Sequence, residues 1–378
     1  MGQRMAELTR TRGTPPWHSH HELKPEESWP DGHPLPLPRW GRPRETFRVD
    51  SVEQYEELAA TVELTVQQMI EAHNYNTVGN LVRFYEEFRS SGEGKVRTFF
   101  RRYRPPITPE HHTCVGLGLE LLQRLRMLHR KFPDVAGKFY LVSCEESIDN
   151  FQSYVSADPS TATSEKEHVL VALKISIAGR NGILLLDPGY HVARVITVMA
   201  DLTYPHTGWF TQSDEPHVRK EYSYAYAENS DYINWVDIET RNKMGRISQS
   251  LIYVAKPYLT PVHVTERRNL VYNFRSYLAR DTKGHLVAGM YFPVKEGASC
   301  VVFFQDGTGK ARVTIPLNAT VRTPGEIHAV RTCGAQLGLA PGQLELLIDK
   351  VSAIISDKDF LRQMLDINRE INVISQEN

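Results

Sequence analysis

The feature that most constrains the fold of this chain is a change in the repeat of its apolar residues. From Ser51 to about residue 132 they recur every three or four positions, which predicts helices starting at Ser51, over about 76–92 and over 107–132. Between about 139 and 317 they alternate or run together, and from Thr323 the helical repeat returns. Helices, then many strands, then helices again predict an α+β protein rather than a doubly wound sheet.

The middle of the chain contains short apolar runs separated by turns rich in glycine. These runs are 139–144, 168–177, 182–187, 192–199, 221–238, 247–258, 285–304 and 311–317. A short turn at Gly179–Gly182 joins two of them, 168–177 and 182–187, so we expect these two strands to pair antiparallel. Three closing helices are predicted at 325–338, 341–355 and 357–370.

These patterns divide the chain into four parts. Residues 1–45 form a Pro-rich arm that we expect to be extended or disordered, because it can bury little apolar surface. We predict a helical domain over 46–137, a β-barrel over 138–258, and an α/β lid with C-terminal helices over 259–378. The long connection 145–167 is expected to form a flexible flap.

The arm contains three tryptophans and a cluster of histidines. These are Trp17, Trp29 and Trp40, with His18, His20 and His21. Aromatic residues along such an arm often pack on the domain that follows. No carboxylate or cysteine lies at ligand spacing from the histidines, so we interpret them as a solvated polar tract and expect no metal site.

The charge balance argues against several classes of function. The chain has 44 Lys and Arg against 45 Asp and Glu, without the basic excess of a nucleic-acid-binding protein. No apolar run approaches the roughly 20 residues needed to cross a bilayer. No apolar signal core stands at the start of the sequence. We therefore expect a cytoplasmic protein with no membrane span and no nucleic-acid partner.

Four cysteines are present, and one of them is placed to act as a nucleophile. They are Cys114, Cys144, Cys300 and Cys333, without the close pairs of a zinc ribbon. Cys114 lies near the start of the 107–132 helix, and the positive end of a helix lowers the pKa of a thiol there. We expect the other three to be core residues.

A cysteine nucleophile needs an imidazole to move its proton and a third group to orient that imidazole. His168 opens one of the two strands joined at Gly179–Gly182, and Asp187 ends the other. Antiparallel pairing brings both to the same edge of the sheet, within reach of a hydrogen bond. The sequence therefore predicts a Cys114–His168–Asp187 triad. His191 could line the same cleft.

The order of these three residues resembles that of the papain-like fold in its transglutaminase-type circular order. Within it, the stretch EHVLVALKI…GILLLDPGYH over 167–191 is similar to the corresponding stretch of arylamine N-acetyltransferases. The resemblance covers roughly residues 60–350 and implies a helical domain, a central antiparallel β-barrel and an α/β lid. That family has Arg-Gly-Gly before the nucleophile, where this chain has His111-His112-Thr113.

The resemblance implies a cysteine-dependent acyltransferase that forms an acyl-thioester on Cys114 and passes the acyl group to a small-molecule amine or hydroxyl. Acyl-CoA is a candidate donor, and Arg101, Arg102 and Arg104 are weak candidates for binding its acidic groups. A solvated helix face is the favoured explanation of these arginines. Two alternatives stay open: a transglutaminase-like cysteine peptidase or amidase, and a catalytically degenerate member used for binding or assembly.

Overall fold

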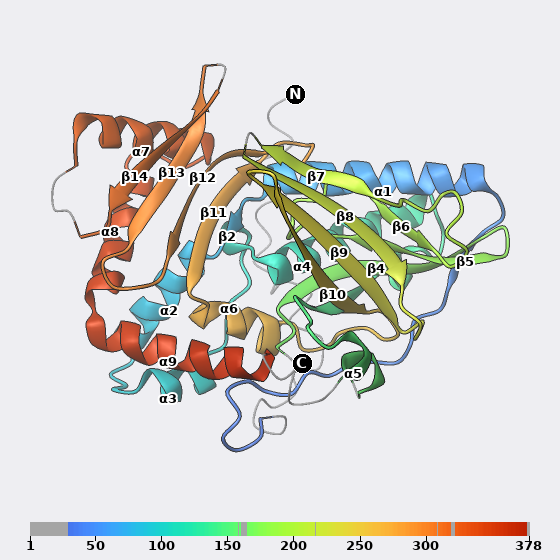
Figure 1. The fold of residues 1–378 in the computed structure, drawn as a ribbon, viewed down its shortest axis with the longest axis horizontal. Coiled ribbons are helices and arrows are strands. Elements are labelled where there is room, and N and C mark those ends of the chain that lie inside the picture. Colours follow the sequence, from blue (N-terminus) through green and yellow to red (C-terminus); the bar gives the residue numbers. More distant parts are fainter. Residues whose placement is uncertain are drawn as a thin grey trace.

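The computed structural model of the protein describes residues 29–375, apart from 158, 160–164, 216, 308 and 319–321. The predicted α+β class is confirmed. Two antiparallel sheets lie side by side, with helices packed between and around them (Figure 1). No helix of the described residues is long and apolar enough to span a membrane.

The N-terminal part is mainly helical. Helix α1 (Val52–Ala72) begins after Ser51, whose side chain accepts a hydrogen bond from the Gln54 N–H. Helices α2 (Val78–Ser90) and α3 (Val96–Arg102) follow. Two short strands in this part, β1 (Phe47–Val49) and β2 (Tyr75–Asn76), were not predicted, because each pairs only with a strand far along the chain.

The helix expected over 107–132 is divided into three pieces. A 3-10 turn, η3 (Pro109–His111), precedes α4 (Cys114–Leu125), and a second one, η4 (Arg126–Arg130), follows it. The break before α4 has a clear cause. The carbonyl of His112 accepts a hydrogen bond from the Asn76 N–H, so the backbone there is extended. Cys114 is therefore the first residue of a new helix.

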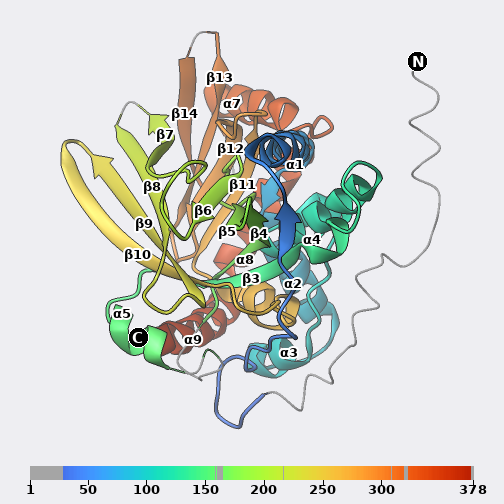
Figure 2. The same ribbon diagram turned by 90° about the vertical axis from the view of Figure 1, so that its right-hand side faces the viewer.

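The first sheet has nine strands in the described part of the chain and is curled into a half-barrel. With β1, its strands are β3 (Tyr140–Glu145), β4 (His168–Ile177), β5 (Arg180–Leu186), β6 (Ile196–Met199), β7 (Phe210–Glu215), β8 (Val218–Tyr226), β9 (Tyr232–Arg241) and β10 (Met244–Tyr253). Their order is β6-β5-β4-β3-β10-β9-β8-β7, and β1 pairs in parallel with β4. The end strands β6 and β7 do not pair, so the barrel expected over 138–258 is open. Figure 2 shows β8, β9 and β10 on the flank away from α1 and α4.

The strand that begins at His168 and the strand that ends just before Asp187 pair antiparallel, which confirms the expectation. β4 and β5 pair from Val171 opposite Leu186 to Ile177 opposite Arg180. The predicted strand over 192–199 is shorter, because residues 188–191 form a turn in which His191 has a φ of 63°.

The second sheet has the order β14-β13-β12-β11-β2 and is covered by the C-terminal helices. Its other strands are β11 (Phe274–Arg280), β12 (Leu286–Pro293), β13 (Ser299–Asp306) and β14 (Gly309–Pro316). The helices are α7 (Pro324–Gln336), α8 (Gln343–Ser356) and α9 (Lys358–Ser375), close to their predicted positions.

Three short helices and two further strands, in addition to β1 and β2, escaped the sequence patterns. The strands are β7 and β11. The helices are α3, α5 (Phe151–Ser156) and a continuous segment that consists of the π-turn η6 (Val262–Glu266) and α6 (Arg267–Val271). In this segment the charged side chains of Glu266, Arg267 and Arg268 are buried. A buried helix with charged inward-facing residues shows no apolar repeat.

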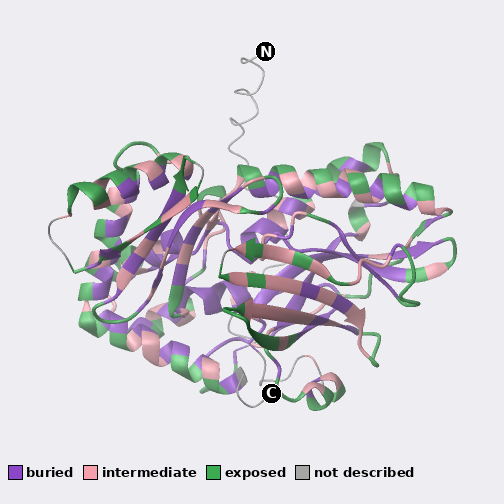
Figure 3. Cartoon of the chain, turned by 45° about the horizontal axis from the view of Figure 1, so that its top comes forward, coloured by how far each residue is buried: buried purple, intermediate pink, exposed green. Residues whose placement is uncertain are grey.

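Both faces of the central strands are covered. Along β4, Val169, Val171 and Leu173 pack with α1 and α4, whereas Leu170 and Ala172 face the interior of the half-barrel. This double burial explains why the strand is apolar throughout rather than alternating. Figure 3 shows buried residues along the strands and on the inward sides of the helices, with exposed residues outside.

The described end of the Pro-rich arm packs on the domain through its tryptophans. The Trp29 ring lies edge-on to Phe100, with ring centroids 6.1 Å apart. Trp40 packs between Tyr253 and Tyr258 and donates a hydrogen bond of 3.3 Å to the Ser143 hydroxyl. The predictions for Trp17 and for the histidine cluster at 18–21 lie outside the described residues.

Candidate active site

Cys114 is the first residue of α4, and the local sequence explains its placement. Thr113 is the N-cap, and its side chain accepts a hydrogen bond of 3.3 Å from the Val115 N–H. Gly118 lets the helix approach the sheet closely, since a Cβ there would lie 3.0 Å from Leu141 Cδ2. The N–H of Cys114 belongs to the first turn, whose N–H groups have no partner within the helix.

His168 and Asp187 lie together at the edge of the half-barrel sheet. His168 Nε2 is 2.9 Å from Asp187 Oδ1, which also accepts a hydrogen bond of 3.0 Å from the Tyr190 N–H. The β4–β5 register, continued past the end of β5, makes His168 and Asp187 diagonal neighbours. Both are buried, with 2% and 0% of their surface exposed.

Cys114 and His168 both lie against Gly189. A Cβ at Gly189 would lie 2.7 Å from His168 Cε1 and 2.8 Å from Cys114 Cβ. Nε2 of the imidazole is engaged by Asp187, so Nδ1 is the ring nitrogen that remains for the thiol. The structure thus brings all three predicted residues together.

The electrostatics of this group favour a protonated imidazole. Burial lowers the pKa of His168, but the charge and hydrogen bond of Asp187 and the hydrogen bond and charge of Cys114 outweigh it. The pKa of His168 is therefore raised well above its usual value. An imidazolium beside a thiol favours the thiolate form of that thiol.

The surroundings of three other histidines, His111, His112 and His191, favour the neutral imidazole. Burial lowers the pKa of both His111 and His112 to about 4, and it lowers the pKa of His191 well below the usual value. His191 is bonded to Arg280, whose guanidinium nitrogen lies 2.9 Å from its Nδ1. Of these four histidines, only His168 is set up to hold a proton at neutral pH.

Tyr190 and Trp235 hold the imidazole from the half-barrel side. The Tyr190 ring lies edge-on to His168 at a centroid distance of 4.6 Å, and Trp235 packs against Tyr190 at 5.2 Å. The Tyr190 hydroxyl donates a hydrogen bond of 2.6 Å to Glu146. These contacts restrict the rotation of the ring that Asp187 orients.

Tyr75, on β2, joins the site from the second sheet. Burial raises its pKa well above the usual value, and the charges of Cys114, Glu266 and Glu146 raise it further. The Tyr75 ring lies edge-on to His191 at a centroid distance of 6.1 Å. No motif could have shown this, because the pairing of β2 with β11 brings the residue to the site.

A buried carboxylate contacts the N-cap of α4. Glu266 accepts hydrogen bonds from the Thr113 hydroxyl and, at 2.8 Å, from the Asn80 side-chain amide. Burial raises the pKa of Glu266 to about 7 against the opposing effects of the Thr113 bond and of Arg275 and Arg83. No motif in the sequence indicates Glu266 as a site residue.

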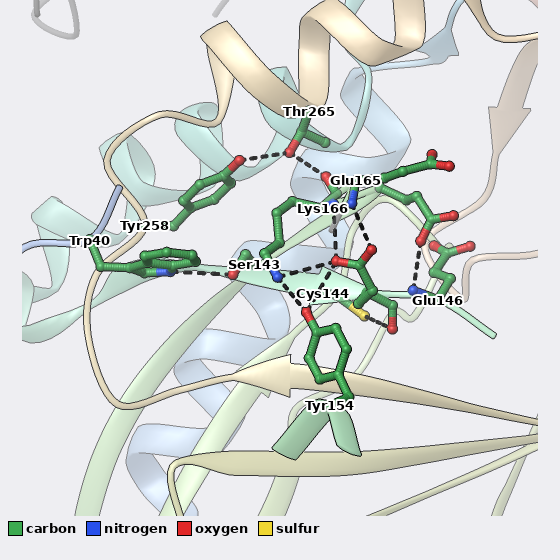
Figure 4. Close-up of polar contacts among 11 residues, drawn as sticks. Trp40, Ser143, Cys144, Glu146, Tyr154, Glu165, Lys166, Tyr258 and Thr265 are labelled. Atoms are coloured by element: carbon green, nitrogen blue, oxygen red, sulfur yellow. Dashed lines mark hydrogen bonds and ion pairs between the residues drawn. The ribbon is translucent and has the colours of Figure 1, made fainter. Parts of the chain in front are cut away.

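The backbone of Glu165 and Lys166, just before Glu167 and His168, is held by another buried carboxylate, that of Glu145 (Figure 4). Glu145 accepts hydrogen bonds from the backbone N–H groups of Glu165 and Lys166, at 2.7 and 3.1 Å. The Lys166 ammonium lies 3.2 Å from Glu145 Oε2, and the Tyr154 hydroxyl donates to the same oxygen at 3.1 Å. Thr265 bonds to the Lys166 carbonyl at 2.5 Å.

Further charged contacts fix the same segment. Arg268 pairs with Glu165 at 2.7 Å, and Glu167 accepts a hydrogen bond of 2.6 Å from the Glu146 N–H. Burial and the charge of Glu146 raise the pKa of Glu167 well above its usual value, although Arg268 opposes this. The described C-terminal end of the expected flap is thus tied into the core, whereas residues 158 and 160–164 lie outside the description.

The arginines proposed for donor binding lie elsewhere. Arg102 pairs with Glu93 at 2.5 Å, and the Arg101 guanidinium lies 4.6 Å from the centroid of the Trp29 ring. Arg102 and Arg104 line a surface hollow of about 750 Å³ whose lining includes none of the triad residues. Two other hollows, of about 460 and 540 Å³, are also lined by other residues.

The remaining cysteines are buried, in agreement with the prediction that they are core residues. Burial raises the pKa of Cys300 and of Cys333 to about 12, and that of Cys144 well above its usual value. Among the described residues, no group of three or more His, Cys, Asp or Glu side chains is arranged to hold a metal ion.

Comparison with known proteins adds no relative to this description. No protein-family model, curated protein or solved structure matches the chain. A thiol at a helix start, a protonated imidazole beside it and a carboxylate behind that imidazole are the components of nucleophilic catalysis.

Proposed function

We propose that this protein is a cysteine-dependent acyltransferase that works through an acyl-thioester on Cys114. The observation that carries the proposal is the placement of Cys114 and His168 around Gly189, with His168 bonded to Asp187. Each group has the role that acyl transfer requires: a nucleophile, a proton carrier and an orienting carboxylate.

In the first half of the reaction, the Cys114 thiolate attacks the carbonyl carbon of the acyl donor. The carbonyl oxygen becomes negative, and the first-turn N–H groups of α4, including that of Cys114, stabilise it. The intermediate then collapses, the bond to the leaving group breaks, and His168 gives its proton to that group. Cys114 is left as a thioester.

In the second half, an amine or hydroxyl of the acceptor attacks the thioester carbonyl. His168, now neutral, takes the acceptor proton while Asp187 keeps the ring in place. The carbon–sulfur bond breaks, so the thiolate and the imidazolium are restored together. No redox partner or metal is needed to balance these steps.

The arrangement of helices, half-barrel and second sheet supports this assignment as an arylamine N-acetyltransferase-like variant of the papain-like fold. Acyl-CoA stays a candidate donor. Cys114 has only 3% of its surface exposed, so the nucleophile is shielded from solvent.

Intact mass after incubation with acetyl-CoA, an acetyl aryl ester and a peptide ester tests the proposal. We expect one acetyl group per chain from at least one acetyl donor, and none in Cys114→Ala. Cys300→Ala, which removes a different buried thiol, should be acylated like the unsubstituted protein. Acylation by the peptide ester alone would favour the peptidase alternative. No adduct from any donor, with Cys114 alkylated no faster than a free thiol, would refute enzymatic function.

A further inference from the structure

The N-cap that begins the nucleophile helix is bound to a buried carboxylate, that of Glu266. The Thr113 hydroxyl accepts the Val115 N–H and donates its own proton to Glu266. Asn80, on α2, donates to the other carboxylate oxygen at 2.8 Å. Glu266 has only 1% of its surface exposed. Its carboxylate is therefore held against Thr113, the N-cap residue that precedes Cys114.

Charged groups face Glu266 from several elements, but none of the described ones forms an ion pair with it. Arg83 on α2 and Arg275 on β11 favour its ionised form through space. The guanidinium groups of its own helical segment are engaged elsewhere: Arg267 with the Phe100 carbonyl and Arg268 with Glu165.

Two tyrosines complete these surroundings. Tyr75 on β2 and Tyr103 after α3 both have their pKa raised, first by burial and in part by the negative charge of Glu266. Neither tyrosine supplies a compensating positive charge. Arg83 and Arg275 compensate the charge of Glu266 only through space, so loss or gain of its proton changes the charge beside the start of α4.

We propose that Glu266 is a positioning residue that regulates Cys114, opposing its thiolate when ionised and releasing that opposition when protonated. The proposal rests on the role of Cys114 as the nucleophile. Its physical basis is that the thiolate and the carboxylate compete for the same helix N-terminus, while two like charges in a buried site raise each other's energy.

The direction with pH follows from the state of the carboxylate. Because burial raises the pKa of Glu266 to about 7, the group is neutral in mildly acidic solution and charged in mildly basic solution. The alkylation rate of Cys114 should therefore rise less steeply above pH 7 than that of an isolated thiol. Removal of the charge should restore the steeper rise.

The test is the rate of Cys114 alkylation by iodoacetamide from pH 5 to pH 9, followed by intact mass in the full-length protein. Glu266→Gln should react about three- to tenfold faster than the unsubstituted protein at pH 8, because the like charge that opposes the thiolate is gone. The two rates should converge at about pH 5.5, where Glu266 is already neutral. Glu86→Gln removes an equal charge from an exposed site on α2 and should follow the unsubstituted protein.

A second variant approaches the same contact from the other side. Thr113→Val keeps the shape of the side chain but removes the hydroxyl, whose hydrogen bond lowers the pKa of Glu266. The inflection in the alkylation profile should therefore move above pH 7. This variant also carries the test if Glu266→Gln does not fold.

The outcomes separate this inference from the proposed function. A reactive Cys114 whose profile is unchanged in Glu266→Gln, or whose inflection does not move in Thr113→Val, overturns the role of Glu266 and leaves the nucleophile intact. A Cys114 that is inert at every pH in the unsubstituted protein overturns the nucleophile and this inference with it.

Discussion

Gly189→Ala adds one methyl group at the point where Cys114 and His168 meet. The backbone of Gly189 does not have a positive φ, so alanine can adopt its conformation without backbone strain. The new Cβ would lie 2.7 Å from His168 Cε1, 2.8 Å from Cys114 Cβ and 3.3 Å from Cys114 Cα. The substitution therefore acts on the distance between the two side chains and changes no charge.

The expected effect can be worked out from these distances. Carbon atoms in contact are normally about 3.5–4.0 Å apart, so the imidazole and the cysteine must each withdraw by about 1 Å. A displacement of about 1 Å at reacting groups can cost about 10²-fold in rate. Insertion of one methyl group into a packed core costs about 1–3 kcal/mol, which a domain of this size can tolerate. We therefore expect a folded protein with a large loss of Cys114 reactivity.

The assay is the rate of Cys114 alkylation at pH 7.5, read by intact mass, together with thermal unfolding. Gly94→Ala is the matched control, because a Cβ at this exposed loop position would meet no atom within 4 Å. It should alkylate at the unsubstituted rate. Equal rates in Gly189→Ala and the unsubstituted protein, with a shifted unfolding temperature to prove that the methyl group was accommodated, would refute the contact between Cys114 and His168.

Three further predictions concern the buried charges. Lys166→Met leaves a buried carboxylate without its counter-ion and should lower the unfolding free energy in urea by about 3–5 kcal/mol, whereas Lys350→Met, at an exposed ion pair, should not change it. Asp187→Asn should lower the pKa of His168 in an NMR titration. In the unsubstituted protein, the stability that comes from the raised pKa of His168 is complete below about pH 6.5 and is lost as the pH rises through the folded-state pKa. The variant should not show that loss. The pKa of Glu266 is raised from 4.5 to about 7, so the free energy of unfolding should fall by on the order of 3 kcal/mol as the pH rises between these values. In urea unfolding at pH 5 and pH 8, Glu266→Gln should show a smaller difference in this free energy.

The fold class and the meeting of His168 with Asp187 could be predicted because they depend on local patterns. A glycine turn between two apolar runs predicts an antiparallel pair, and that pairing brings the ends of the runs to one edge. The start of α4 could not be predicted, since the apolar repeat indicated one continuous helix over 107–132. Only the long-range bond between Asn76 and His112 shows why the helix begins again at Cys114.

The groups that surround the triad could not be predicted, for a different reason. Tyr75 reaches the site through pairing with a strand about 200 residues later, and Glu266 lies in a helical segment with no apolar repeat. Lys166 was expected to belong to the flexible flap over 145–167, because it is charged and follows a polar stretch. Its ammonium is buried against Glu145 and Tyr154, and a sequence pattern contains no trace of such a partnership.

Each member of the triad has a neighbour that is fixed by a carboxylate. Glu266 binds Thr113, which precedes Cys114; Glu145 binds the backbone at 165–166, just before His168; and Glu146 binds the hydroxyl of Tyr190, three residues after Asp187. Burying carboxylates is costly, and apolar side chains of similar volume often give equal or greater stability. The buried Glu266 and Glu145, with the half-buried Glu146, around these three residues are therefore better explained by the proposed positioned chemistry than by stability. A degenerate binding protein would have no such need, and in it the alkylation rate of Cys114 would not respond to the loss of any one of the three.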